Sequence, residues 1–358
     1  MSKKYTAAML ALLLTVMVAL AGCGAKQQEP KEAVKSAAAN ATKMTSYAMK
    51  SKFTLDNLSI VMKNESENAA IGNAMSYLKN AELTVDGVYQ ADPMQTEMTM
   101  NLALKGDMAM TFTVPMVMTK EKLFVKIPNI PMLPMPEKIV GKFLEMDLKE
   151  LAEESGTEFS PDSLDQAKMQ QLSTDVINAI LAEYDQTKYF KNIKPSDAGL
   201  PEGVDAKQVV QFSVDNSNVK EAVTIFVNKS MPKVLDVLSK PEYRDMLQIK
   251  QEDLDEAKKE LQSTDQSELN KTLNEMKDHL KVNKFNINMA MNKDNYPVYQ
   301  NIKTDVEVQD EEMNVKVAFT GSSQYSKINE KQDFKIGIPT GDQVITMEQL
   351  QQETGSTY

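Results

Sequence analysis

Few residues of this sequence have the types needed for covalent or acid–base chemistry. The 358-residue chain has one cysteine, Cys23, and one histidine, His279. A single cysteine excludes an internal disulfide, and no thiol nucleophile or thiolate metal site is available beyond Cys23. His279 follows Lys277 and Asp278 in a charged stretch, which is typical of a solvated side chain. The Asp and Glu residues match no calcium loop, zinc-protease motif, P-loop or dinucleotide fingerprint. We therefore expect no enzyme, no catalytic residue and no metal.

The sequence before Cys23 indicates what its thiol does. Lys3 and Lys4 open the chain, an apolar block follows over residues 7–20, and Ala21 and Gly22 precede the cysteine. The block is shorter than the roughly 20 residues of a membrane-spanning helix, so the segment reads as an export signal. The alternative is an ordinary secreted protein that is cut nearby and carries an incidental cysteine.

The run L-A-G-C, ending at Cys23, resembles the lipobox of bacterial lipoproteins. This resemblance implies that residues 1–22 are a lipoprotein signal peptide and that Cys23 becomes the new N-terminus. It also implies a covalent diacylglycerol on the thiol and room for an N-acyl chain on the same residue. Two acyl chains hold a protein stably on a membrane, whereas one chain does not. We expect no other cofactor.

Lipidation at Cys23 would place the rest of the chain on the outer face of the cell membrane. No later apolar run approaches the length of a membrane span. The formal charge is −11, and loss of Lys3 and Lys4 with the signal makes it more negative. An acidic chain of this kind is a poor match for nucleic acid, whose binding needs concentrated basic charge. The expected location is extracytoplasmic and lipid-anchored.

The remaining sequence predicts one α+β domain over residues 46–340. It follows the lipidated cysteine, a tether and a first helix in residues 23–45. A charged helical insert is expected at about 232–280, and residues 341–358 read as a polar tail. Runs of strands with helices clustered between them favour α+β over alternating βα units.

Two regions alternate apolar and polar residues strictly, which predicts antiparallel meanders with one apolar face. The predicted strands cover residues 46–55, 83–89, 98–104, 108–114, 123–127, 143–148, 210–214, 285–291, 298–308, 313–319 and 334–338. Helices are predicted at 30–44, 64–78 and 162–184, and residues 223–227 have no clear period. The proline-rich run 128–136 predicts an extended loop, either a flap over a pocket or a segment that packs across a sheet edge. Residues 150–160 read as a polar turn.

A long antiparallel sheet with one apolar face must curl or be covered. We therefore expect a curved antiparallel half-barrel with helices over its concave face. The chain has 25 methionines, and several of them alternate within these strands. Methionine suits surfaces that accept ligands of varied shape, but it also fills solid cores, so both roles stay open. The candidate ligand-lining residues are Met98, Met100, Leu102, Met108, Met110, Phe112, Met289 and Met291.

The order of these segments resembles a known family. In order, the segments are the lipobox at Cys23, a short helix, S-Y-A-M-K-S-K-F at 46–53, a methionine-rich meander, K-F-L-E-M-D-L at 142–148, a helix and a second meander. Together they are similar to the LolA/LppX-like lipoproteins of Gram-positive bacteria. This resemblance implies a LolA-like half-barrel whose apolar cavity holds acyl chains of a lipid or a lipoprotein. The charged block at 233–280 is longer than the helical lid of that family.

Two functions from different classes follow. The first is a membrane-anchored lipoprotein that binds or carries a lipid-like hydrophobic ligand in the half-barrel. The second is a non-enzymatic structural or interaction lipoprotein of the cell envelope, with a solid core and an envelope protein as its partner. A solute-binding lipoprotein would need alternating βα units in two lobes, which the meanders do not provide.

Overall fold

The computed structural model describes residues 27–64, 71–72, 75, 78, 80–105, 109–130, 135–154, 166–263, 279–309 and 313–355. Its strands are β1 (Ser46–Met62), β2 (Glu82–Ala91), β3 (Met94–Leu104), β4 (Met110–Thr119), β5 (Lys122–Lys126), β6 (Phe143–Asp147), β7 (Phe190–Ile193), β8 (Gln208–Val214), β9 (Leu280–Met291), β10 (Pro297–Gln309), β11 (Met313–Ser326) and β12 (Val344–Thr346). Its helices are α2 (Pro30–Ala41), α4 (Leu148–Glu154), α5 (Gln166–Leu181), α6 (Gln186–Tyr189), α7 (Pro195–Ala198), α8 (Val219–Ile225), α9 (Met231–Leu238), α10 (Pro241–Leu247), α11 (Gln251–Ser263) and α13 (Met347–Thr354), with a π-helical turn η2 (Phe226–Ser230) and a short 3-10 turn η3 (Gly341–Gln343).

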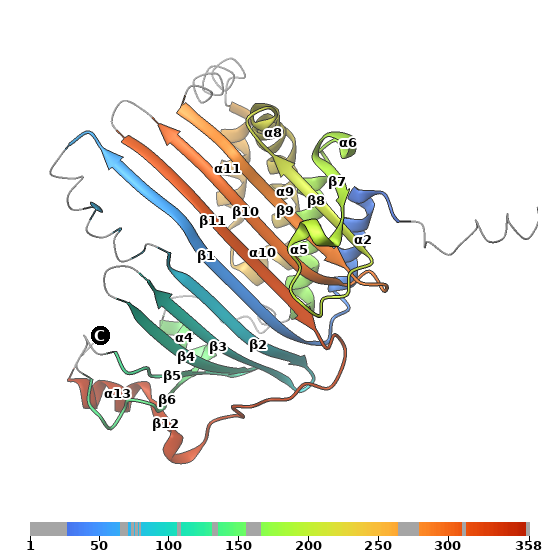
Figure 1. The fold of residues 1–358 in the computed structure, drawn as a ribbon. Coiled ribbons are helices and arrows are strands. Elements are labelled where there is room, and N and C mark those ends of the chain that lie inside the picture. Colours follow the sequence, from blue (N-terminus) through green and yellow to red (C-terminus); the bar gives the residue numbers. More distant parts are fainter. Residues whose placement is uncertain are drawn as a thin grey trace, which may run out of the picture.

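All of these strands belong to one open, curved sheet, ordered β12-β6-β5-β4-β3-β2-β1-β11-β10-β9-β8-β7 (Figure 1). Neighbouring strands are antiparallel except for β12, which runs parallel to β6. The first predicted meander and the β9–β11 part of the second are therefore confirmed, and the α+β class with a curved, mostly antiparallel sheet is correct. The meanders join through the pairing of β1 with β11, where Phe53 lies opposite Gly321.

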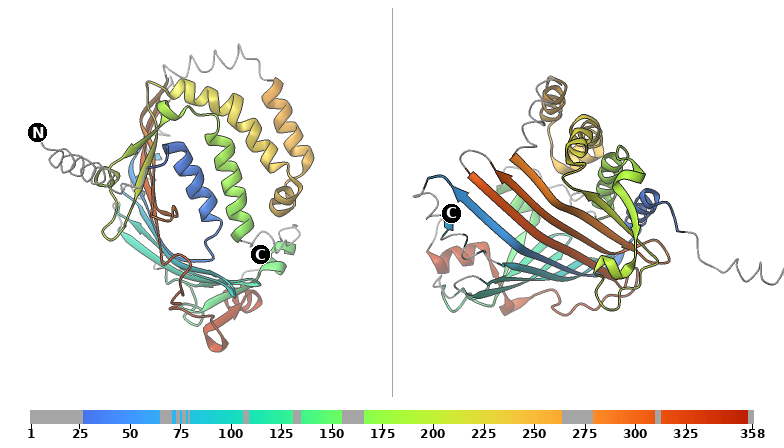
Figure 2. Two further views of the ribbon diagram at one scale, coloured as in Figure 1. Left: turned by 90° about the vertical axis from the view of Figure 1, so that its right-hand side faces the viewer. Right: turned by 45° about the horizontal axis from the view of Figure 1, so that its top comes forward.

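Most of the described helices gather at the end of the sheet formed by β7 to β10, whereas α4 and α13 lie at the other end, on β6 and β12 (Figure 2). Helix α2 begins at Pro30, in the first turn where the missing N–H is tolerated. Its buried side chains are small, including Ala37, so its backbone lies close to the sheet and to α5. The Thr174 hydroxyl of α5 donates to the Ala38 carbonyl at 3.0 Å. Helices α9, α10 and α11 pack outward from α5.

Aromatic rings fill the core between these helices and the sheet. Tyr184 and Tyr189 meet edge to face at 5.0 Å between ring centroids, and Tyr184 meets Phe212 of β8 at 5.3 Å. The Tyr184 hydroxyl donates to the Ala222 carbonyl of α8 at 3.0 Å, and burial raises the pKa of that hydroxyl. Buried aromatic rings with a bonded polar tip give both packing area and fixed geometry.

Residues 223–227, whose period the sequence leaves unclear, are helical. They form the end of α8 and the start of the π-helical turn η2. The turn ends at Ser230, immediately before Met231 and two residues before Pro232, which has no N–H to donate and whose ring would collide with the carbonyl four residues earlier. A wider π turn accommodates that conflict. Fully buried Ser230 donates its hydroxyl to the Ile180 carbonyl at 3.0 Å, which fixes this turn on α5.

The C-terminal arm, residues 327–355, differs from the sequence-based prediction. Residues 334–338 are not a strand, although Phe334, Ile336 and Ile338 alternate with polar residues. Glu97 of β3, which is 4% exposed, holds this segment instead. Its carboxylate accepts hydrogen bonds from the backbone N–H groups of Lys335 at 2.7 Å, Ile336 at 2.9 Å and Gly337 at 2.6 Å. Gly337 has φ +71°, a conformation that favours glycine.

Three other segments also differ from their predicted form. Part of the expected polar turn at 150–160 is helix α4, whose first backbone N–H groups at Lys149 and Glu150 donate to Asp147 Oδ1. Part of the expected polar tail forms β12 and α13. The predicted first strand extends to Met62. Most of the predicted helix at 64–78, the middle of the proline-rich run and residues 264–278 of the helical insert lie outside the described residues.

Asp175 joins α5 to α10 in the helical block. Its Oδ2 accepts from Lys240 Nζ at 2.7 Å and from the Tyr243 hydroxyl at 2.9 Å. Burial opposes ionisation of Asp175, but the hydrogen bonds from Lys240 and Tyr243 outweigh it and lower the pKa of the carboxyl below 3.8. Burial and Asp175 together raise the pKa of Tyr243 to about 12.

Asp175→Asn is expected to cost about 1 kcal/mol at neutral pH, because it removes a charge-assisted hydrogen bond that is partly exposed. The folded-state pKa lies below the unfolded value, so the contribution is complete above pH 3.8 and is lost as the pH falls through the folded pKa. Thermal unfolding between pH 3 and pH 7 measures this. The difference from wild type should shrink towards pH 3, and Asp245→Asn, exposed on α10, is the control. A pH-independent difference would contradict the assignment.

Candidate functional site

One side of the sheet carries no charged residue across seven neighbouring strands, β1–β4 and β9–β11. We call it the uncharged face. The strand registers place the polar residues Ser51, Ser323, Gln300 and Thr304 on this face. They also place on it the apolar residues Tyr47, Met49, Phe53, Leu55, Leu58, Ile60, Met62, Leu83, Val85, Met98, Met100, Leu102, Leu104, Met110, Phe112, Val114, Met116, Leu280, Val282, Phe285, Ile287, Met289, Ile302, Val306, Val308, Met313, Val315, Val317, Phe319 and Tyr325. The opposite face of the same strands carries the charges, for example Lys52, Asp86 and Lys303.

Helices cover only part of the uncharged face. Their main contacts with the sheet in the described residues fall at its two ends, on β7, β8 and β10 and on β6 and β12. The centre, from β4 across to β11, consists of half-buried side chains. Two of its apolar side chains are exposed, Phe53 at 42% and Met313 at 37%, and Ile287 of β9, nearer the helix-covered end, is 36% exposed. Broad apolar faces of this kind mark binding surfaces more often than isolated exposed residues do.

Phe53 lies at the middle of this face, opposite a glycine that leaves room for its ring. A Cβ on Gly321 would lie 2.9 Å from Phe53 Cδ1 and 3.1 Å from Ile302 Cγ2, so the ring occupies the space that a side chain would fill. Beside the ring is a shallow hollow of about 270 Å³, lined by the apolar residues Phe53, Leu55, Ala81, Leu83, Leu102 and Phe319 together with Thr54 and Glu82. The hollow has the chemistry of a site for hydrocarbon.

The one carboxylate at the rim of the hollow is neutralised. Glu82 Oε2 lies 2.7 Å from Lys105 Nζ and 3.1 Å from Lys52 Nζ. Hydrogen bonds from Lys105 and Lys52 lower the pKa of Glu82, so the carboxylate stays ionised and paired. The paired carboxylate of Glu82 would therefore repel an anionic headgroup at the rim only weakly.

The predicted ligand-lining residues fall into two groups. Met98, Met100, Leu102, Met110 and Phe112 share the uncharged face on β3 and β4, where Met100 pairs with Val114 and Leu102 pairs with Phe112. All five are half-buried, and Leu102 lines the hollow. Met108 lies outside the described residues.

Met289 and Met291 belong to the helix-covered end of the sheet. Met291 is 1% exposed in the core with α2, Tyr184 and Phe212, and Met289 packs against that core. For these two residues the packing fits the alternative of a solid methionine core. The sequence could not separate the two groups, because both alternate in the same way along a strand.

Sequence reasoning missed the aromatic centre of the hollow. Phe53 and Leu83 were placed in strands but given no role, and Phe319 was treated in the same way. The local signal was their alternation within apolar strands. Phe53 meets Leu83 through the β1–β2 pairing, whereas Phe319 reaches them only through the β1–β11 pairing, which sets it opposite the distant Leu55.

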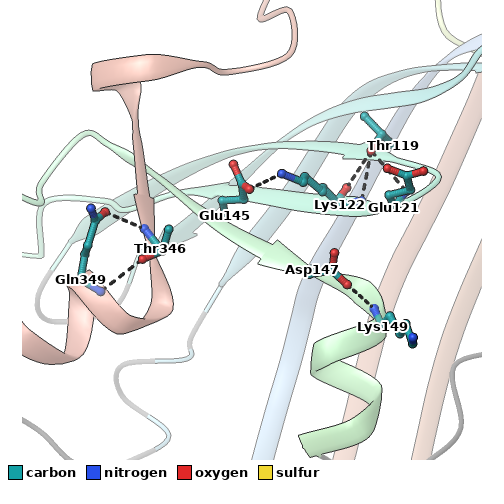
Figure 3. A network of polar contacts seen from close by, with 8 residues as sticks. All are labelled: Thr119, Glu121, Lys122, Glu145, Asp147, Lys149, Thr346 and Gln349. Atoms are coloured by element: carbon teal, nitrogen blue, oxygen red, sulfur yellow. Dashed lines mark hydrogen bonds and ion pairs between the residues drawn. The ribbon is translucent and has the colours of Figure 1, made fainter.

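A polar network lies at the other end of the sheet, around β5, β6 and β12 (Figure 3). Lys122 pairs with Glu145 on the neighbouring strand, and Thr119 Oγ1 accepts from the backbone N–H of Lys122 at 3.1 Å. Thr346 and Gln349 form a capping box that begins α13. These bonds hold turns, strand pairs and helix starts. In the described part of the chain, no group of three His, Cys, Asp or Glu residues is placed to hold a metal ion.

No protein-family model and no curated protein matches this chain. Among the described residues, the helices are too short or too polar to cross a bilayer.

Proposed function

We propose that this chain is a lipoprotein anchored through Cys23 to the outer face of the cell membrane, where it binds a lipid-like hydrophobic ligand. The uncharged face is the binding surface in this proposal, and it corresponds to the concave side of a LolA-like half-barrel with helices over part of it. Cys23 supplies the anchor, and the hollow beside Phe53 receives hydrocarbon. The proposal contains no catalytic step.

The observation that carries the proposal is the extent of the uncharged face. The described helices make their main contacts outside its centre, which spans five strands, β11 and β1–β4, spaced about 4.8 Å apart and 10 to 17 residues long. Over about ten residues these strands share a sheet area of roughly 600 Å², and its half-buried apolar side chains expose part of that area. Covering apolar surface stabilises by about 25 cal/mol per Å², so a hydrocarbon ligand would gain substantial free energy there.

The alternative is an interaction lipoprotein of the envelope, with a solid core and a protein partner. The enclosed positions of Met289 and Met291 favour a solid core at the helix-covered end. They do not account for the exposed side chains of Phe53 and Met313 at the centre of the face. For that reason the lipid-binding function has better support.

Native mass spectrometry of the chain from residue 24 onward, before and after solvent extraction, tests the proposal. A removable adduct of lipid mass is the expected result. Phe53→Lys should abolish the adduct by placing a charge in the hollow. Thr111→Lys is the matched control, because Thr111 is exposed on β4, lies on the opposite face of the sheet and does not line the hollow. Protein without an adduct after isolation under detergent-free conditions, with a protein partner recovered by cross-linking, would favour the interaction lipoprotein.

A further inference from the structure

The chain leaves the folded domain beside the edge strand β7. Gln208, which is 3% exposed, accepts from the Gln28 backbone N–H at 3.2 Å and donates its amide to the Gln28 carbonyl at 2.8 Å. The same amide donates to Asn192 Oδ1 of β7 at 2.8 Å. A buried side chain thus fixes the exit point of the chain to β7 and β8.

A second contact holds the start of α2. Lys31 Nζ donates to the carbonyls of Ala182 at 2.7 Å and Tyr184 at 2.9 Å, just beyond the end of α5. The exit point is therefore bound to the sheet and to the helical block together. Gln28 lies five positions after Cys23, and a fully extended chain over those five steps reaches about 17 Å. If Cys23 is acylated, as the proposed function requires, β7 must lie close to the membrane surface.

The segment that forms this edge is basic in an acidic protein. Residues 186–196, Q-T-K-Y-F-K-N-I-K-P-S, contain three lysines and no acidic residue, whereas the whole chain has a formal charge of −11. Lys188 is paired with Glu221. Lys191 and Lys194 are exposed, and neither has a carboxylate partner within the part of the chain that the structure describes. Asp197, the next acidic residue along the chain, accepts from Ser196.

We propose that the β7 edge faces the anchoring membrane and that Lys191 and Lys194 bind the phosphate groups of anionic lipid headgroups there. The tether brings both ammonium groups close to the surface, and electrostatic attraction acts within a Debye length of about 8–10 Å. Each lysine near an anionic surface strengthens the attraction about fivefold. On a protein that is already anchored, the attraction of two lysines is enough to favour one orientation of the domain on the membrane over others.

The single cysteine makes a direct test feasible. The chain from Cys23 onward, which contains every described residue, is coupled through that thiol to a maleimide lipid in vesicles of phosphatidylcholine, with or without phosphatidylglycerol. A water-soluble amine reagent then labels accessible lysines, and mass spectrometry reads each site. We expect labelling of Lys191 and Lys194 to fall about fivefold on the anionic vesicles. Lys120, exposed between β4 and β5 far along the sheet, is the internal control.

Equal labelling of Lys191 and Lys194 on both kinds of vesicle would overturn the proposal, as would an equal fall at Lys120. A double variant, Lys191→Gln with Lys194→Gln, should lose the anionic-lipid-dependent protection of backbone amides in residues 186–196. A matched pair on exposed positions elsewhere, Lys50→Gln with Lys316→Gln, should keep it. Retained protection in the first double variant would also refute the role of the lysines. Chemical coupling replaces biological acylation, so these outcomes do not depend on whether Cys23 is lipidated in cells or whether the uncharged face binds lipid.

Discussion

Replacing Glu97 by glutamine is expected to lower the free energy of unfolding by about 3 kcal/mol. The buried carboxylate accepts three backbone N–H groups from consecutive residues of the C-terminal arm. A glutamine of the same size keeps one acceptor oxygen but turns an NH₂ group towards N–H donors. At least one buried donor then loses its partner, at a cost of about 1–3 kcal/mol, and the charge-assisted bonds are lost as well.

The effect should reach beyond the hydrogen bonds themselves. Ile336, in the segment that Glu97 holds, packs on the core cluster of Val117, Phe124 and Phe143. The same arm continues into β12, which pairs with β6 at the sheet edge. Loosening of the arm should therefore expose the edge of β6, and limited proteolysis should cut after residue 327 earlier than in wild type.

Chemical denaturation of the Glu97→Gln variant measures the stability change. Asp86→Asn is the matched control, because Asp86 is exposed on the neighbouring strand and the same face of the sheet. Exposed substitutions of this kind usually change stability by no more than about 0.5 kcal/mol. Equal unfolding midpoints for the two variants would show that the carboxylate does not hold the arm.

Alternation along the chain was sufficient to predict most of the strands, but not the segment that Glu97 binds. A half-buried antiparallel strand requires apolar residues at every second position, and β3 and β10 satisfy that pattern. Residues 334–338 satisfy it as well, yet Gly337 has a left-handed conformation and Ile338 is 51% exposed. The deciding interaction is a carboxylate from a strand some 240 residues earlier, which no local pattern contains.

Two of the missed helices did carry local signals. Asp147 precedes α4 and caps its first N–H groups, and Thr346 with Gln349 forms a capping box at α13. Both arrangements are known helix starts, but the polar composition of these segments favoured turn and tail in the prediction. The candidate site was predictable only in part. The shared face of Met98, Met100 and Leu102 follows from period two, whereas the hollow depends on the β1–β11 pairing.

The second large effect on stability is expected from the methionines, because some lie in the helix-covered core and others on the centre of the uncharged face. Met291→Ala is expected to lower the free energy of unfolding by about 2–5 kcal/mol, because its side chain is 1% exposed between α2 and the sheet and would leave a cavity. Met100→Ala should cost about 1 kcal/mol or less, since the half-buried side chain is not enclosed by a core cluster of the described residues. Denaturant unfolding of both variants, side by side, measures the contrast.

Ligand binding should respond in the opposite order. If the centre of the uncharged face holds hydrocarbon, Met100→Ala should reduce the lipid adduct seen by native mass spectrometry, whereas Met291→Ala should reduce stability and leave the adduct of the remaining folded protein unchanged. An equal stability loss at both positions would mean that the centre of the face is enclosed as tightly as the helix-covered end. In that case a solid core would extend across the whole sheet, and the interaction lipoprotein would become the better-supported function.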